Sequence, residues 1–302
     1  MIVVLGPTAT GKTRFAAHLA ARFNGEVISA DSRQVYRGMD QGTGKDYEDY
    51  VVDGVNIPYH MVDIVDPGYE YNVFEFRNDF IAAFNSIVSC GKTPVLCGGS
   101  GLYLEAVLSG YELANVPVNK QLRDDLARKS QGELNQILSQ VKPLHNTTDL
   151  SHRDRTIRAI EIAMFENQQP GSSHQKLPKF TPIIFGLHFE RAEIRKRITD
   201  RLKRRLESGM TDEVVNLLKS GLKPEQLMFY GLEYKYLTLY VIGKISRDEM
   251  FTQLNTAIHQ FAKRQMTWFR RMEKRGTKIN WIDGRLTMEE KVGDAEGIVQ
   301  RA

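Results

Sequence analysis

The sequence predicts an α/β fold, a parallel sheet with flanking helices, into which an α-helical domain is inserted. Five short apolar runs predict buried strands, at residues 2–5, 26–30, 93–99, 181–189 and 277–283. Segments with helical spacing of apolar residues follow the first three strands, at 12–23, 73–91 and 102–108. Strands and helices that alternate in this way form parallel sheets with crossover helices.

The chain changes character between the third and fourth strands. Two segments with turn-forming residues read as linkers, at 111–119 and 168–178. Between them, residues 120–167 are polar and mostly helical, with breaks expected at Gly132 and Pro143. We therefore expect a core made of residues 1–110 and 179–302 and a helical insertion at 111–178. Within the second part of the core, two basic helices are expected at 191–220 and 246–275.

A phosphate-binding loop follows the first strand directly. Residues 6–13 read GPTATGKT, the pattern G-x-x-x-x-G-K-[ST] between a strand and a helix. Its members are Gly6, Pro7, Thr8, Ala9, Thr10, Gly11, Lys12 and Thr13. Backbone N–H groups and Lys12 would face an anion, and the Thr13 hydroxyl would reach a magnesium ion. The core is thus P-loop NTPase-like, but the loop alone suits ATP, GTP or another diphosphate.

An acidic residue stands after the second strand and is missing after the third. A P-loop ATPase usually ends a core strand in an acid that helps to hold magnesium, whereas glycines and Ser100 follow the strand at 93–99. Asp31 directly follows the strand at 26–30. Ligands of doubly wound sheets bind at this edge, so we predict that Asp31 faces the group that accepts a transfer. A surface turn is the alternative interpretation of Asp31.

Composition and charge restrict the class of protein. The 302 residues include 41 Lys and Arg against 37 Asp and Glu, and three basic segments favour a polyanionic partner such as nucleic acid. The two cysteines, Cys90 and Cys97, are expected to be reduced thiols in apolar surroundings. No leader, membrane-spanning segment or Cys/His cluster is evident, so a soluble cytoplasmic protein is expected.

Six motifs in order along the chain resemble one family. They are GPTATGKT, ISADSRQVYRGMDQGTGK, YHMVDIVDP, GGSGLYLEAVL, DRTIRAIE and AKRQMTWFR. From Gly6 to about Trp281 the chain closely resembles bacterial tRNA dimethylallyltransferases, also called tRNA isopentenyltransferases. The resemblance implies that the P-loop holds dimethylallyl diphosphate with Mg²⁺. The dimethylallyl group would pass to N6 of adenosine 37, 3′ of the anticodon, giving N6-dimethylallyladenosine and diphosphate.

The resemblance also implies roles for individual residues. Asp31 matches the general base on N6, Lys12 and Thr13 match diphosphate and magnesium contacts, and Arg201 matches a diphosphate-binding arginine. Ser100 stands where most members have Thr beside the diphosphate. The positions that match tRNA contacts are Asp31, Ser32, Arg33, Gln34, Ser100, Arg123, Arg155, Thr156, Ile157 and Arg158. The partners implied are the anticodon stem-loop of tRNA and dimethylallyl diphosphate, with the protein acting as a monomer and not at a membrane.

Two stretches depart from the family pattern, and other functions stay open. Where many members have Gly-Tyr-Arg/Lys-Glu/Gln, this chain has Gly231-Leu232-Glu233-Tyr234, which puts a basic contact in doubt; residues 42–45 read GTGK in place of Gly-Thr-Ala-Lys. An adenylate isopentenyltransferase that acts on free nucleotide and a P-loop small-molecule kinase are the alternatives. An RNA-binding P-loop protein without transfer chemistry is a third.

Overall fold

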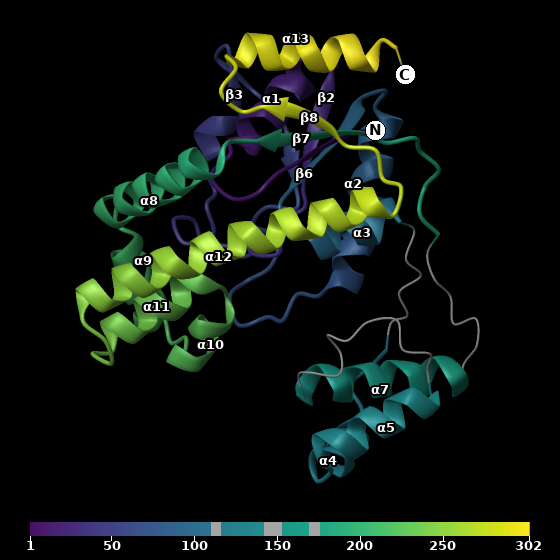
Figure 1. Ribbon diagram of the computed structural model, residues 1–302, viewed down its shortest axis with the longest axis vertical. Helices are drawn as coiled ribbons and strands as arrows, with labels where there is room; N and C mark the ends of the chain where they lie inside the picture. The colour runs from purple at the N-terminus through teal and green to yellow at the C-terminus, as the bar shows by residue number, and fades with distance from the viewer. Residues whose placement is uncertain (110–115, 142–152, 169–175, 302) are drawn as a thin grey trace. The chain divides into compact units, whose positions relative to one another are not determined.

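The chain divides into two compact units. The computed structural model describes residues 1–109, 116–141, 153–168 and 176–301. One unit is formed by Met1–Gly110 and Leu177–Ala302, and the other by Tyr111–Lys176. The larger unit contains the sheet, and the smaller one is helical (Figure 1). The break expected at Pro143 and most of the linker expected at 168–178 lie outside the described residues.

The larger unit is built on a six-stranded parallel sheet in the order β5-β2-β6-β1-β7-β8. The strands are β1 (Ile2–Leu5), β2 (Gly25–Ser29), β5 (Tyr59–His60), β6 (Thr93–Gly98), β7 (Ile183–His188) and β8 (Asn280–Asp283). The predicted fold class and the five predicted strands are confirmed, and β5 at the edge was not foreseen. The apolar strand β1 is buried because it pairs in parallel with β6 on one side and β7 on the other.

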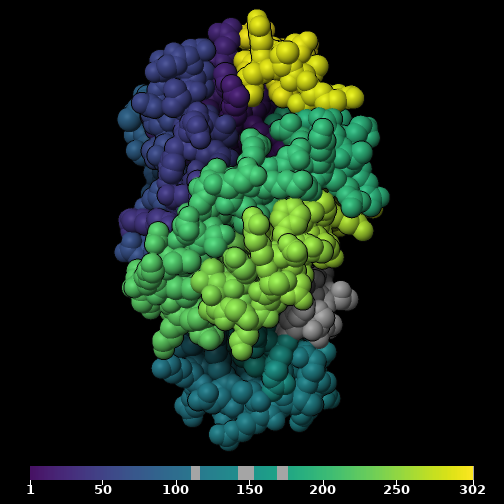
Figure 2. Space-filling model, turned by 90° about the vertical axis from the view of Figure 1, so that its left-hand side faces the viewer, coloured from purple at the N-terminus to yellow at the C-terminus, as the bar shows by residue number. Residues whose placement is uncertain are grey.

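Helices cover both faces of the sheet (Figure 1). The flanking helices are α1 (Lys12–Arg22), α2 (Val73–Ser89), α3 (Gly101–Leu108), α12 (Arg247–Lys274) and α13 (Met288–Val299). On one face α1 and α13 pack on alternate strand residues such as Ile2 and Val4. On the other, α2, α3 and the end of α12 pack on Val3 and Leu5. Figure 2 shows α13, in yellow, against the N-terminal segment, in purple.

A second group of helices packs around the loop that follows β2. It comprises α8 (Arg191–Glu207), α9 (Met210–Lys219), α10 (Pro224–Phe229), α11 (Leu232–Val241) and the first half of α12, and its core includes Tyr36 and Tyr234. The expectation of one helix over 191–220 is wrong. Gly209 has φ +94°, a left-handed conformation that interrupts the helical path, so α9 begins on a new axis. The helix expected at 246–275 is confirmed, and Ser246 caps it.

Besides β5, α10 and α11, several other elements escaped the sequence prediction. A 3₁₀ helix (Tyr47–Tyr50) leads into a hairpin of β3 (Val51–Val52) and β4 (Val55–Asn56). Its turn residues Asp53 and Gly54 both have positive φ, the Asp-Gly pair that two-residue hairpin turns favour. The tail helix α13 was also missed, although Thr287 and Glu290 form the capping box that marks its start.

The smaller unit consists of three described helices. They are α4 (Lys120–Ala127), α5 (Gln131–Val141) and α7 (Arg153–Gln168). Leucine and isoleucine side chains from all three form its core: Leu126, Leu134, Leu138, Ile157 and Ile160. The break expected at Gly132 is wrong by a few residues, because Ser130 and Glu133 cap each other's backbone and start α5 before the glycine. Among the described residues, no helix is both long enough and apolar enough to cross a membrane.

Candidate active site

The P-loop curls between the end of β1 and the start of α1. Ala9 and Gly11 both have left-handed φ values, +64° and +78°, and the Thr10 hydroxyl donates a hydrogen bond to the Pro7 carbonyl at 2.9 Å. Gly11 caps α1 without any side-chain hydrogen bond to the helix N-terminus. The first N–H groups of α1 are therefore left for an anion, which the helix dipole also favours.

A glutamine from α12 joins the P-loop to the turn after β6. The Thr8 N–H donates to Gln265 Oε1 at 2.9 Å, and Gln265 Nε2 donates to the Gly99 carbonyl at 2.9 Å. Gln265 is only 7% exposed. Since its amide satisfies both backbone groups, it fixes the distance between the two loops. Sequence reasoning missed this residue, and the only signal was a glutamine among the apolar positions of the AKRQMTWFR motif.

The turn after β6 lies between the P-loop and the acidic end of β2. A Cβ on Gly99 would come within 2.5 Å of Gln265 Nε2 and 3.5 Å of Lys12 Cε, so a larger residue here would displace the Gln265 amide from its present position. Beside it, the Ser32 N–H donates to Ser100 Oγ at 3.2 Å. Ser100 thus lies where the turn after β6 meets the loop after β2.

Asp31 lies at the carboxyl edge of the sheet, as predicted. Its Oδ1 accepts a hydrogen bond from the Arg33 N–H at 2.9 Å, and the side chain is half-buried. This contact fixes the carboxylate while leaving its second oxygen without a hydrogen bond from the described residues. A fixed carboxylate with an oxygen to spare can accept a proton from a ligand.

Burial shifts the pKa values of two groups beneath the P-loop. It lowers the pKa of Lys12, and the nearby charge of Asp31 is among the groups that oppose this shift. Burial also raises the pKa of Cys97 to about 12. Cys97 therefore stays a neutral thiol at physiological pH. The expectation for Cys90 is wrong, because this cysteine caps the exposed end of α2 and is itself exposed.

Arginines from α8 line the other side of the P-loop. Arg197 Nε donates to the Ala9 carbonyl at 2.9 Å, and Arg201, one turn further on, places Nη1 3.3 Å from Thr8 Oγ1. Arg201 and Arg205 both pair with Asp46, at 2.8 and 2.6 Å. Part of the basic segment that begins at 191 is therefore not a solvated face but a wall of the anion site.

The loop that carries Asp46 is itself held from two sides. Glu213 accepts hydrogen bonds from three successive N–H groups, those of Asp40, Gln41 and Gly42, at 2.8, 2.7 and 3.0 Å. Lys45, whose side chain is 1% exposed, pairs with Asp40 at 2.9 Å and with Asp63. The lysine of the GTGK stretch is therefore a buried anchor that orients Asp46 toward the arginines.

Gln34 has protein partners at both ends of its amide. The Ser29 hydroxyl donates to Oε1 at 2.9 Å, and Nε2 donates to the Gly44 carbonyl at 3.1 Å. A base that Gln34 reads would have to exchange with one of these bonds. Glu233, at the departure from the family pattern, is close enough to feel the charges of Arg205 and Arg201, which oppose the rise in its pKa that burial causes.

The residues of the smaller unit that are predicted to contact tRNA differ in their ion pairing and burial. Arg123 and Arg158 both pair with the buried Glu161, at 2.8 and 2.5 Å, whereas Arg155 is exposed. Thr156 and Ile157, which belong to the same predicted tRNA-contacting stretch, have side chains that are buried within this unit. Thr156 accepts a hydrogen bond from Gln131, and Ile157 packs in the core.

The donor set suits a magnesium ion that is bound with its substrate. No group of three or more His, Cys, Asp or Glu side chains that could hold a metal occurs among the described residues. The Thr13 hydroxyl at the start of α1 is the P-loop group that would hold it. Magnesium keeps several waters and takes other ligands from substrate phosphates, so one protein hydroxyl fits it.

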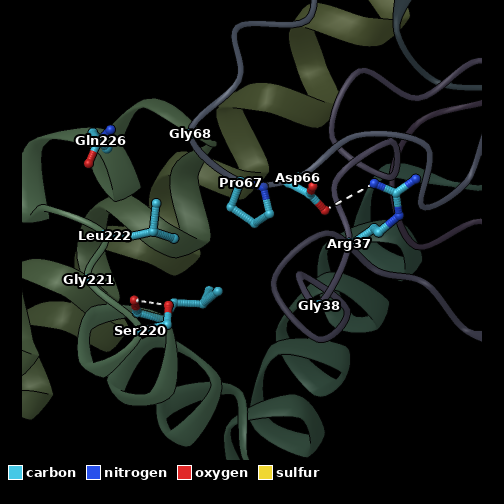
Figure 3. Close-up of a pocket in the computed structure, with 10 residues that line it drawn as sticks. Arg37, Gly38, Asp66, Pro67, Gly68, Ser220, Gly221, Leu222 and Gln226 are labelled. Atoms are coloured by element: carbon cyan, nitrogen blue, oxygen red, sulfur yellow. Dashed lines mark hydrogen bonds and ion pairs between the residues drawn. The ribbon is translucent and has the colours of Figure 1, made fainter.

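Surface cavities lie away from these residues. A cavity of about 560 Å³ is lined by residues between the β2 loop and α9–α10, including Arg37, Asp66 and Leu222 (Figure 3). The Arg37–Asp66 ion pair at 3.0 Å closes one side of it. Since it contains no P-loop residue, the candidate site is defined by the side chains around the P-loop and not by this cavity.

A P-loop flanked by arginines and facing a carboxylate at the sheet edge defines a P-loop enzyme of group transfer. The family model described as IPP transferase matches residues 34–272, and the chain belongs to that family. It is 58% identical to tRNA dimethylallyltransferase 2 of Bacteroides fragilis, over 97% of this chain and 95% of that one. The corresponding protein of Phocaeicola vulgatus is 56% identical over the same shares.

Two solved structures show the same architecture. The full-length tRNA isopentenylpyrophosphate transferase of Bacillus halodurans matches with a TM-score of 0.71 and 29% identity, over 99% of this chain and 95% of that one. A eukaryotic dimethylallyltransferase acting on tRNA matches with a TM-score of 0.80 over all of this chain and 79% of that one. At 21% identity the second match concerns the fold alone.

Proposed function

We propose that this protein transfers a dimethylallyl group from dimethylallyl diphosphate to N6 of adenosine 37 in tRNA. The observation that carries the proposal is the short bonded path from the P-loop to Asp31. It runs from Thr8 through Gln265 to the Gly99–Ser100 turn, and from Ser100 to the Ser32 N–H beside Asp31. This path supports adjacent places for a diphosphate leaving group and an acceptor amine. The names of the relatives support the same reaction.

The side chains present supply the chemistry that this transfer needs. An adenine amine is a weak nucleophile, because its lone pair is delocalised into the ring. As N6 bonds to the first carbon of the allyl group, the carbon–oxygen bond to diphosphate breaks and the N6 proton passes to Asp31. Lys12, Arg201 and the N–H groups at the start of α1 stabilise the charge that grows on the departing diphosphate.

Magnesium belongs to the proposal as a group bound with the diphosphate, near Thr13. When bound, it neutralises charge on the diphosphate and makes it a better leaving group. Lys12 and Arg201 act on the same charge from the protein side. The protein should therefore require magnesium when the donor occupies the P-loop.

The smaller unit is proposed to bind the phosphates of the anticodon stem-loop. Arg155 is exposed on α7, and Arg123 and Arg158 are each about 38% exposed while they pair with Glu161. Extruding a stacked base costs a few kcal/mol, which such contacts would offset. We further propose that the protein acts as a monomer in the cytoplasm.

One experiment separates this function from its alternatives. The protein is incubated with labelled dimethylallyl diphosphate, Mg²⁺ and, in parallel, an anticodon stem-loop, AMP or no acceptor, and the labelled product is identified by mass. Label on the stem-loop adenosine alone is expected. Efficient labelling of AMP would favour an adenylate isopentenyltransferase. A parallel incubation with ATP and Mg²⁺ tests the kinase: ATP hydrolysis that Lys12→Ala abolishes, with no prenylation in the other incubations, would favour it.

A further inference from the structure

One aromatic side chain beside the candidate site is held in place but left open to solvent. Phe229 ends α10 and is 53% exposed. The guanidinium carbon of Arg33 lies over its ring, 5.3 Å from the ring centroid. Behind it, the ring meets Tyr230 edge to face at 5.8 Å, and Tyr230 meets the buried Tyr36 at 4.6 Å. The ring is therefore supported by a row of aromatic side chains that leads into the core.

This ring is linked to Asp31 by a short path. Arg33, whose guanidinium covers Phe229, donates its backbone N–H to Asp31 Oδ1 at 2.9 Å. All of these residues belong to the larger unit. Arg33 therefore connects the exposed ring directly to the carboxylate that receives the N6 proton in the proposed reaction.

An exposed aromatic ring beside a guanidinium matches the chemistry of an unpaired nucleotide. Proteins that bind single-stranded RNA stack unpaired bases on aromatic rings and on arginine planes, while the positive charge attracts the backbone. We propose that Phe229 and Arg33 form a stacking platform for an unpaired anticodon-loop nucleotide that neighbours the target adenosine. This inference rests on the proposed function and adds to it a place for a second nucleotide.

The position of the ring argues for RNA as the occupant in preference to a protein. The extruded adenosine remains covalently tied to its neighbours, so a nucleotide next to it must lie close to Asp31. A base and a protein surface also require different side chains at position 229. A base needs a flat ring to stack on, whereas apolar burial by a protein accepts an aliphatic side chain of similar size.

The test compares substitutions at Phe229 with a matched pair elsewhere on the unit. Phe261 on α12 is 38% exposed and has Arg264 5.9 Å from its ring centroid, so Phe261→Ala removes a similar ring beside a similar cation. Binding of an anticodon stem-loop is measured by fluorescence anisotropy for wild type, Phe229→Ala, Phe229→Leu, Phe229→Trp and Phe261→Ala. Thermal unfolding and the KM for dimethylallyl diphosphate are measured in parallel.

We expect Phe229→Ala and Phe229→Leu to weaken stem-loop binding ~10-fold, the size of one lost base–aromatic stack. Phe229→Trp and Phe261→Ala should bind within about twofold of wild type, and the donor KM should not change. The salt dependence gives a second readout. Phe229→Ala should keep the wild-type slope of log K against log salt, whereas Arg33→Ala should lower that slope by about one.

Several outcomes would overturn the inference. If Phe229→Leu binds as well as wild type, apolar contact and not stacking is what the ring provides. If Phe229→Ala binds no more weakly than Phe261→Ala, the platform does not exist. If the wild-type protein binds the stem-loop and all ring variants bind it equally well, the platform is refuted but the proposed function is not. A wild type that binds no stem-loop refutes the proposed function itself.

Discussion

Replacing Gln265 by Met tests whether the P-loop depends on its bridge to α12. Methionine has a similar volume and length, so packing changes little. The Gly99 carbonyl then loses its partner at a buried position, and the Thr8 N–H loses its partner at a partly buried one. An unpaired buried group costs about 1–3 kcal/mol, so the unfolding free energy should fall by about 2 kcal/mol. For a unit of this size that lowers Tm by about 4–8 °C.

The bridge should matter for the donor as well as for stability. Without it, Thr8 and the turn at Gly99 are no longer held at a fixed distance, and the P-loop N–H groups lose their alignment. Calorimetric titration with inorganic diphosphate and Mg²⁺ should show ~10-fold weaker binding to Gln265→Met. Gln265→Glu should bind more weakly still, because an ionised carboxylate cannot donate to the Gly99 carbonyl and repels the anion.

A second bridge on the same helix provides the control. Arg275 pairs with Glu105 on α3 at 2.7 Å and touches no P-loop residue. Arg275→Gln should alter Tm slightly and leave diphosphate affinity unchanged. If Gln265→Met loses stability but binds diphosphate like wild type, the glutamine only supports the fold and the reasoning about alignment is refuted.

Three further substitutions probe individual groups of the site. Asp31→Asn should lower single-turnover prenylation by ~10²–10⁴-fold and spare stem-loop binding; a near-normal rate would exclude a general base. Lys12→Ala should weaken diphosphate binding in calorimetry without changing stem-loop affinity. Burial, and then the charge of Asp46, raise the pKa of Asp49 to about 6 from its ordinary 3.8. Ionisation of Asp49 therefore opposes folding increasingly between about pH 4 and 6. Asp49→Asn should raise the unfolding free energy by about 1 kcal/mol at pH 8, after allowing for solvent screening, and should leave it unchanged at pH 3.5. An equal gain in stability at both pH values in thermal melts would contradict this origin.

The parts of the fold that were predicted are those with a local signature. The strand β1, the P-loop and α1 form one continuous pattern, and the ends of α12 carry their own capping residues. The two-residue strand β5 has no such pattern, since its place is set by pairing with β2. The division of the segment 191–220 depends on one glycine, Gly209, whose positive φ no periodicity reveals.

The same distinction explains which residues of the site were found. Lys12, Thr13 and Asp31 could be predicted because a motif or a strand end marks them within a few positions. Gln265 could not, since the groups that it joins lie 257 and 166 positions away in the chain. Glu213 likewise acts on a loop more than 170 positions earlier.

Asp46 shows why these remote contacts matter for the chemistry. It sits between Arg201 and Arg205, and these arginines lower its pKa although burial alone would raise it. One carboxylate shared by two arginines leaves this group of three side chains with one positive charge, which favours an anion over a neutral ligand. Glu213 and Lys45 fix the loop that carries Asp46, so the position of this carboxylate beside the arginines depends on side chains outside the P-loop. The sequence motif forms the anion-binding loop, and contacts from remote parts of the fold determine how strongly that loop attracts an anion.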